Sequence, residues 1–97
     1  MVIGAARDLP TKPLPKDSVH ERFIDQELFL FDSEDSSCTV HTLNGGAALI
    51  WYLCDGARDV QSIAHEIATY FDRSEQEVLP DVRAAVARFH ELSLLET

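Results

Sequence analysis

Two cysteines and four histidines are the side chains of this sequence best suited to bind a metal or to act as nucleophiles. Cys38 and His41 are three residues apart, and His20 precedes them in a separate segment. A structural zinc site needs four such ligands arranged as a tetrahedron. If residues 38–41 are extended, Cys38 and His41 point to opposite faces of the strand. The spacing therefore does not favour a metal site, and we expect none.

Cysteine catalysis requires a base or a positive charge that lowers the pKa of the thiol. Cys54 instead ends an apolar run with no base beside it, so we expect a buried thiol there and a free thiol at Cys38. Two cysteines also do not make a disulfide framework. His65 and His90 fall on the polar flanks of predicted helices, where a solvated side chain is the simpler explanation.

The glycine pair and the acidic loop do not complete any known binding motif. Gly45-Gly46 lacks the Lys and the Ser or Thr of a phosphate-binding loop. The polar segment Asp32–Ser37 lacks the glycine and the ligand spacing of an EF-hand. The sequence thus predicts no catalytic residue, no metal and no cofactor. We expect a binding protein rather than an enzyme.

The length and the charge narrow the class of protein further. The chain has 97 residues, which suits one small domain. Its net charge is −9, and residues 1–16 carry +2 while the rest carries −11. This acidity argues against a nucleic-acid partner, because phosphate binding depends on Lys and Arg. No apolar run approaches the ~20 residues of a membrane span, and no signal peptide is recognisable, so we expect a cytoplasmic protein with no membrane contact.

The elements that must position any binding residues begin after a proline-containing tail. Three prolines predict a flexible tail over residues 1–17, followed by one folded domain over residues 18–97. Alternating apolar, aromatic and β-branched residues predict three strands, with Asp25-Gln26 as a tight turn between the first two. We expect an antiparallel meander with two unpaired edges. The predicted strands are Val19–Ile24, Glu27–Phe31 and Cys38–Thr42.

Three amphipathic helices are predicted after the strands. Asn44 is suited to cap the first helix and Asp59 the second. Ser74 and Glu77 have the spacing of a capping box at the start of the third. Pro80 lies early in that third helix, where we expect a kink in the first turn. Leu94 and Leu95 are expected to fold back onto the core. The predicted core consists of Phe29, Phe31, Leu43, Ile50, Trp51, Leu53, Ile63, Ile67, Phe71, Val82, Val86, Phe89 and Leu92.

An exposed third strand is the most promising binding element of this fold. Its free N–H and C=O groups can pair with an added strand from a peptide. Fixing a flexible peptide costs about 1–2 kcal/mol of backbone entropy per residue, so apolar anchors are needed as well. A groove between the third strand and the third helix would receive them. On that helix Asp81, Ala84 and Arg88 lie on one flank, although ordinary surface charge also explains the acid and the arginine.

Several segments together resemble the PqqD family. Leu43–Gly56, which reads LNGGAALIWYLCDG, is similar to the family signature of a helix that contains "LN…A…IW…CDG". Residues 63–72 resemble the second helix of the family. The third helix and the end of the chain are also similar, at Glu77–Val82, Phe89, Leu92 and Leu95. The resemblance covers about residues 19–96.

The resemblance implies a winged-helix-like α+β fold, with a three-stranded antiparallel sheet followed by three helices. It implies a peptide chaperone that binds the leader of a ribosomally made precursor peptide as an added strand. Such a chaperone presents the peptide to a modifying enzyme, often a radical S-adenosylmethionine maturase, and pyrroloquinoline quinone is the product in the founding member. Carried onto this chain, the leader would contact Thr39, Val40, His41, Thr42, Asp81, Ala84 and Arg88.

Two other functions remain alternatives. A winged-helix DNA-binding regulator would share the helical arrangement, but the third helix offers Arg83 and Arg88 against four acidic residues, where a recognition helix normally carries several cations. A docking subunit of an enzyme complex, without a peptide site, would bury the third strand under a protein partner. The open strand edge is compatible with a monomer or a homodimer.

Overall fold

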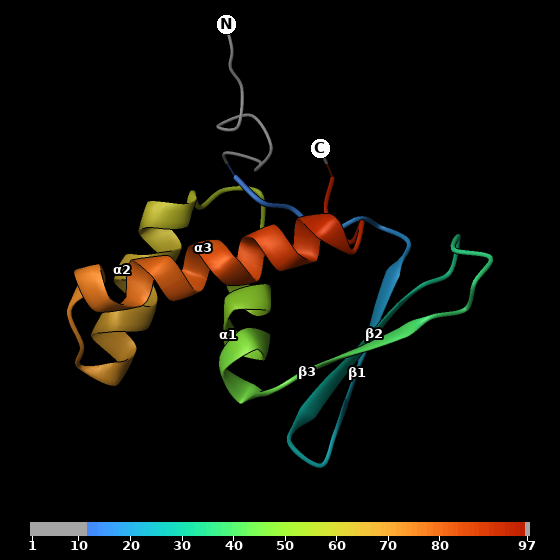
Figure 1. The fold of residues 1–97 in the computed structure, drawn as a ribbon, viewed down its shortest axis with the longest axis horizontal. Helices are drawn as coiled ribbons and strands as arrows, with labels where there is room; N and C mark the ends of the chain where they lie inside the picture. Colours follow the sequence, from blue (N-terminus) through green and yellow to red (C-terminus); the bar gives the residue numbers. More distant parts are fainter. Residues whose placement is uncertain (1–11, 97) are drawn as a thin grey trace, which may run out of the picture.

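A three-stranded antiparallel sheet precedes three helices along the chain (Figure 1). The computed structural model describes residues 12–96. The strand order is β1-β2-β3, so each strand pairs with its neighbour in sequence. This arrangement confirms the predicted α+β fold class. The elements are β1 (Val19–Ile24), β2 (Glu27–Asp32), β3 (Val40–Leu43), α1 (Gly45–Leu53), α2 (Val60–Phe71) and α3 (Glu75–Glu91).

β1 and β2 form a hairpin around the predicted turn. Asp25 and Gln26 have φ angles of 52° and 68°, so both adopt the left-handed conformation. A two-residue turn with two positive φ angles matches the right-handed twist of the flanking strands. The turn sets the register, in which Phe23 lies opposite Leu28.

The third strand begins at Val40, two residues later than predicted. Cys38 has a φ of 58°, which takes the chain out of the extended conformation. Its N–H donates to the carbonyl oxygen of Asp35 at 3.2 Å, and the Asp35 carboxylate accepts the N–H of Ser37 at 3.0 Å. This turn delays pairing with β2, so Thr39 lies outside the strand.

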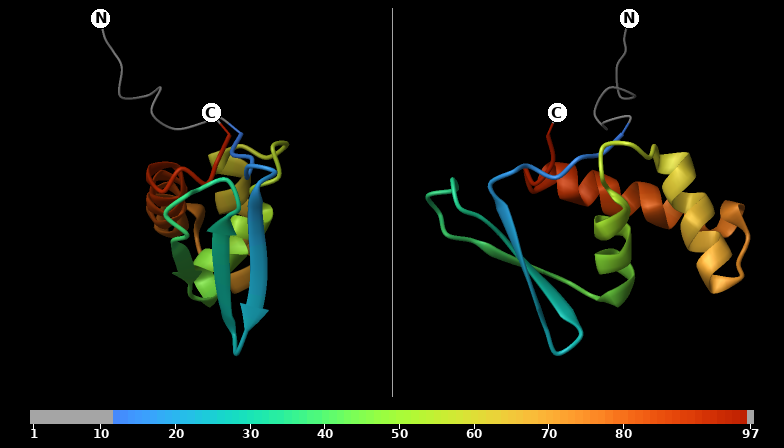
Figure 2. Two further views of the ribbon diagram at one scale, coloured as in Figure 1. Left: turned by 90° about the vertical axis from the view of Figure 1, so that its right-hand side faces the viewer. Right: turned by 180° about the vertical axis from the view of Figure 1, so that it is seen from behind.

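β2 directs its leucines, and not its phenylalanines, toward the core. Leu28 and Leu30 are fully buried, whereas Phe31 is 41% exposed. The prediction that Phe29 and Phe31 belong to the core was therefore wrong by one step of the two-residue alternation of a strand. The helices lie behind one face of the sheet in the left view of Figure 2. Only the side chains on that face are covered.

α1 connects the sheet to the other helices. Its N-cap is Asn44, as predicted, and the Asn44 side chain accepts the N–H of Ala47 at 2.9 Å. Trp51 is buried, and its indole N–H donates to the carboxylate of Glu21 on β1 at 2.5 Å. The same indole meets Phe89 of α3 edge to face, with ring centroids 5.2 Å apart. Trp51 thus links α1 to both β1 and α3.

α2 and α3 pack against each other and carry the predicted caps. The Asp59 side chain accepts the N–H of Ser62 at 2.7 Å, and Ser74 and Glu77 form the capping box. α3 is one continuous helix that includes Pro80. This proline is exposed, so water can satisfy the carbonyl group that its missing N–H leaves without a partner.

Three predicted core residues lie at the margin instead. Phe71 is 50% exposed because it is the last residue of α2, and Leu53 and Leu92 are half-buried. Leu94 and Leu95, which follow α3, are fully buried, so the expected return of the chain to the core is confirmed.

The N-terminal segment differs from the predicted tail over the residues that the structure describes. Residues 1–11 of the predicted tail lie outside the described residues. Pro13 is fully buried, and its carbonyl oxygen accepts the N–H of Gly56 at 2.9 Å. The Lys16 N–H donates to Leu94 at 3.0 Å, and Pro15 forms an antiparallel bridge with Leu95. A proline ring buries well, and its carbonyl still accepts hydrogen bonds, so residues 13–16 are part of the packed unit.

Candidate functional site

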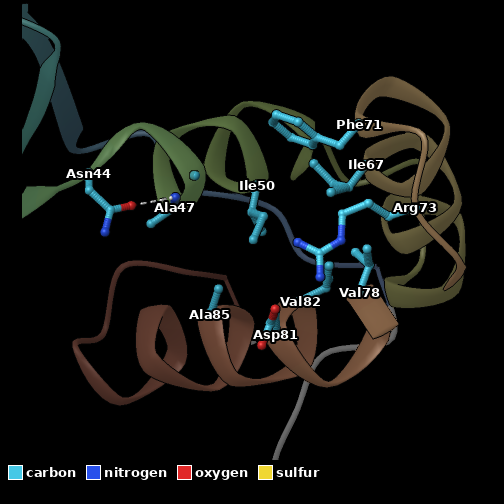
Figure 3. A pocket seen from close by; sticks show the side chains of 11 residues that line it. Asn44, Ala47, Ile50, Ile67, Phe71, Arg73, Val78, Asp81, Val82 and Ala85 are labelled. Atoms are coloured by element: carbon cyan, nitrogen blue, oxygen red, sulfur yellow. Dashed lines mark hydrogen bonds between the residues drawn. The ribbon is translucent and has the colours of Figure 1, made fainter. Parts of the chain in front are cut away.

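A pocket of about 540 Å³ opens between the three helices (Figure 3). Its lining is mainly apolar and comes from the start of α1, the end of α2 and the first half of α3. The lining residues are Asn44, Gly46, Ala47, Ile50, Ile67, Phe71, Arg73, Val78, Asp81, Val82 and Ala85. A pocket of this volume accommodates one or two large apolar side chains of a peptide.

The apolar wall follows from helical periodicity. On α3, Val78, Val82 and Ala85 are spaced by four and three residues and so share one face. On α1, Ala47 and Ile50 face them across the pocket in Figure 3. Ala47 and Ala85 are small, so the two helices leave space between them instead of closing their interface.

Two charged side chains stand at the pocket. Arg73 extends from the loop after α2 toward the space between α1 and α3, and Asp81 approaches that space from α3 (Figure 3). The Arg73 guanidinium has only one ion pair within reach among the described residues, with Glu77 at 3.7 Å. Both charges at this ion pair are more than half exposed, so it is weak. Arg73 and Asp81 can therefore re-pair with charges on a bound peptide.

The free edge of β3 leads directly to this pocket. β3 pairs with β2 on one side, and within residues 12–96 no strand covers its other side. The strand ends at Leu43, and the next residue, Asn44, already lines the pocket. The open edge of β3 and the pocket therefore adjoin each other where the strand ends.

The structure brings some of the predicted site residues together and separates others. Val40, His41 and Thr42 lie in β3, with His41 directed toward the covered face, because it pairs with buried Leu30. Asp81 lines the pocket. The remaining three lie neither in β3 nor at the pocket. Thr39 precedes the strand, and Ala84 and Arg88 are exposed on α3, where the Arg88 guanidinium lies 3.7 Å from the Glu91 carboxylate.

Most of the pocket was not anticipated from the sequence. The apolar stripe of α3 was identified, but it was assigned to the closed core. The helical positions that adjoin Asp81 on the pocket side are Val78, Val82 and Ala85, whereas the prediction followed Ala84 and Arg88 on another flank. The signal that would have found the pocket is the occurrence of alanines at facing positions of α1 and α3, Ala47 and Ala85, where larger side chains would close the interface.

The two cysteines lie in different environments. Cys38 is exposed and Cys54 is buried, as predicted, and neither forms a disulfide. Burial, with a smaller contribution from Asp55, raises the pKa of the Cys54 thiol to about 12, so it stays protonated. Residues 12–96 contain no cluster of three or more His, Cys, Asp or Glu side chains that could hold a metal ion. Within the same range, none of the helices has both the length and the apolar character of a membrane span.

The comparison with protein families identifies the chain. The sequence pattern of the family described as coenzyme PQQ synthesis protein D (PqqD) matches residues 27–95, from β2 to the buried leucines after α3. The chain belongs to the PqqD family. The match confirms the family resemblance that the sequence suggested. Members of this family are non-catalytic binding domains.

A solved structure has a similar fold. It is described as "TbiB1 in Complex with the TbiA(beta) Leader Peptide", and it superimposes with a TM-score of 0.73 at 23% sequence identity. The similarity covers 86% of this chain and 94% of that chain. No curated protein sequence matches the chain.

Proposed function

We propose that this PqqD-family protein binds the leader of a ribosomally made precursor peptide and presents it to a modifying enzyme. The observation that carries the proposal is the continuity of the open β3 edge with an apolar pocket. The family membership and the fold shared with a leader-bound protein support it. Because both the precursor and its modification belong to the cytoplasm, we propose that the protein acts there.

The energetics explain why both the edge and the pocket are needed. Each backbone hydrogen bond contributes about 0.5–1.5 kcal/mol net, whereas fixing each peptide residue costs about 1–2 kcal/mol. Strand pairing alone therefore does not hold a flexible peptide. Burying one large apolar side chain adds about 1.5–3 kcal/mol. The pocket between α1, α2 and α3 supplies that anchor.

The topology gives the bound peptide a direction. The rest of the sheet is antiparallel, and antiparallel pairing is the more stable arrangement per residue. A peptide antiparallel to β3 places its upstream end beside Leu43 and Asn44, next to the pocket. Its downstream end, which leads to the segment to be modified, leaves beside Val40.

We propose contacts along this path for the residues that the sequence suggested. The peptide strand lies along Thr39, Val40, His41 and Thr42. Asp81 lies beside the apolar side chain of the peptide that the pocket holds. Ala84 and Arg88 lie about one and two helical turns beyond Asp81 and contact the peptide farther along α3. We propose a radical S-adenosylmethionine maturase as the modifying enzyme, in the biosynthesis of pyrroloquinoline quinone or of another modified peptide.

Amide NMR spectra recorded during titration with a leader peptide test this proposal. Synthetic copies of the leaders of short reading frames beside the gene are the probes. We expect shifts in residues 39–43, in the pocket residues Ala47, Asp81 and Ala85, and at Ala84 and Arg88 farther along α3, with saturation at micromolar peptide or below. Shifts that leave β3 and α3 unaffected, or no shifts with any of these peptides, would contradict the proposal and favour a docking subunit without a peptide site.

A further inference from the structure

A second, aromatic hollow lies on the other side of α1 from the pocket. It measures about 380 Å³ and is lined by Phe23, Gly45, Ala48, Leu49, Tyr52, Tyr70 and Phe71. Its four aromatic residues are unusually open to solvent: Phe23, Tyr52 and Phe71 are 50–55% exposed and Tyr70 is 75% exposed. No charged residue lines the hollow. Large aromatic side chains gathered at such exposure mark a binding surface.

The residues of α1 are divided between the pocket and the hollow. Gly46, Ala47 and Ile50 face the pocket, whereas Gly45 and Ala48 face the hollow. α1 thus separates the two cavities.

Phe71 at the end of α2 borders both cavities, so the two surfaces are continuous across its ring. The end of α2, the start of α1 and the β1–β2 turn lie at the same end of the molecule in both Figure 1 and the right view of Figure 2. A single extended ligand can therefore reach both cavities.

Both cavities are lined by residues that directly follow β3. The strand stops at Leu43, Asn44 lines the pocket and Gly45 lines the hollow. A peptide that pairs antiparallel with β3 has its upstream residues at this point. The upstream segment leaves the strand edge here, where Asn44 and Gly45 line the two cavities.

We propose that the aromatic hollow binds a second apolar side chain of the same precursor peptide, upstream of the residues that pair with β3. The inference rests on the proposed function. It deepens that function because it defines a leader with two apolar anchors, one on each side of α1. Aromatic walls without charge favour an aromatic or aliphatic side chain as the second anchor. The continuity with the pocket favours the peptide over the modifying enzyme as the occupant.

The two glycines of α1 give a matched pair of blocking variants. A side chain at Gly45 would meet nothing within 4 Å of its Cβ, and one at Gly46 would meet only Asn44, at 3.7 Å. Neither glycine has a positive φ. Gly45→Phe therefore fills the hollow and Gly46→Phe fills the pocket without strain in the backbone. Circular dichroism and thermal unfolding of each variant check that the fold is intact.

Fluorescence anisotropy with labelled synthetic leaders from the neighbouring reading frames measures the effect. We expect Gly45→Phe to weaken binding of the full leader by about tenfold or more, which corresponds to the loss of one buried apolar side chain. A leader shortened at its upstream end should bind wild type and Gly45→Phe equally. Tyr70→Ser, which removes an exposed wall of the hollow, should weaken the full leader in the same direction.

The outcomes separate the two proposals. If the full leader binds wild type and Gly45→Phe equally while Gly46→Phe weakens it, the second anchor is refuted and the proposed function stands. If Gly45→Phe leaves peptide binding unchanged but slows modification by the enzyme, the hollow belongs to the enzyme interface and the inference is wrong. If no leader binds the wild type, the proposed function fails and the inference fails with it.

Discussion

Individual residues in left-handed backbone conformations shape the sheet of this protein. Asp25 and Gln26 form the β1–β2 turn, and Cys38 lies in the loop that precedes β3. None of the three is glycine, although a residue with a side chain is less stable in this conformation by about 1–2 kcal/mol. The pairing of the strands therefore stabilises a turn that its own residues do not favour.

Replacing Gln26 by glycine should relieve part of this strain. We expect Gln26→Gly to raise the free energy of unfolding by about 0.5–1 kcal/mol, because the gain in the folded turn exceeds the entropy that glycine adds to the unfolded chain. Urea denaturation measures the difference. Gln26→Ala is the control and should give no gain; an equal gain from alanine would show that strain at φ 68° is not the cause.

The two thiols should react differently. Cys38 is exposed and should be alkylated by iodoacetamide in the native protein, whereas Cys54 should react only after unfolding. Because the pKa of Cys54 is about 12 in the folded state and about 8.5 in an unfolded chain, its contribution to stability is complete below pH 8.5. That contribution is lost as the pH rises toward 12.

Mass spectrometry of the alkylated protein counts the modified thiols. Thermal unfolding between pH 8 and pH 11 measures the loss of stability, and Cys54→Ala should reduce the slope. Rapid alkylation of both cysteines in the folded protein would contradict the buried position of Cys54.

At the scale of elements, local signals were readable from the sequence and contacts between elements were not. Asn44, Asp59 and Ser74 were recognised as caps because each acts on a backbone group three residues away. The sequence did not reveal which face of β2 points to the core, because leucine and phenylalanine alternate there and both are apolar. The pocket was missed because it exists only once three helices have packed together.

Pro80 is an element-scale feature with a measurable cost. Proline in a helix interior is less stable than alanine by about 3 kcal/mol. Since this proline is exposed and near the start of α3, we expect Pro80→Ala to raise the free energy of unfolding by about 1–2 kcal/mol. Chemical denaturation is the measurement. Pro80→Gly should give a smaller gain, and a loss of stability in both variants would mean that the proline ring has a packing role.

At the scale of the whole molecule, the segment before β1 is hydrogen-bonded both to the loop after α1 and to the end of the described chain. The Gly56 N–H donates to Pro13, the Lys16 N–H to Leu94 and the Glu96 N–H to Leu14, at 2.9, 3.0 and 2.7 Å. The last two of these hydrogen bonds join the N-terminal segment to the residues around the buried leucines that follow α3. The segment before β1 therefore supports the same core that positions α3 and the pocket wall.

Two truncated chains test this support. A chain that begins at residue 12 retains these contacts, whereas one that begins at residue 18 loses them. We expect the shorter chain to be less stable by about 2–4 kcal/mol, from the lost hydrogen bonds and the exposed core leucines. Differential scanning calorimetry compares the two. Equal melting temperatures would show that residues 12–17 are dispensable for the fold.

The open edge of β3 has a consequence for the protein in solution. An edge that accepts a peptide strand can also accept the same edge of another copy, which is a route to aggregation. β3 has only four residues, and every copy carries a net charge of −9 at neutral pH, so copies repel one another before their edges meet. This protection disappears near the isoelectric point of about 4.6. Colloidal stability is thus a by-product of the acidity, and an acidified solution is where the peptide-binding edge becomes a site of self-association.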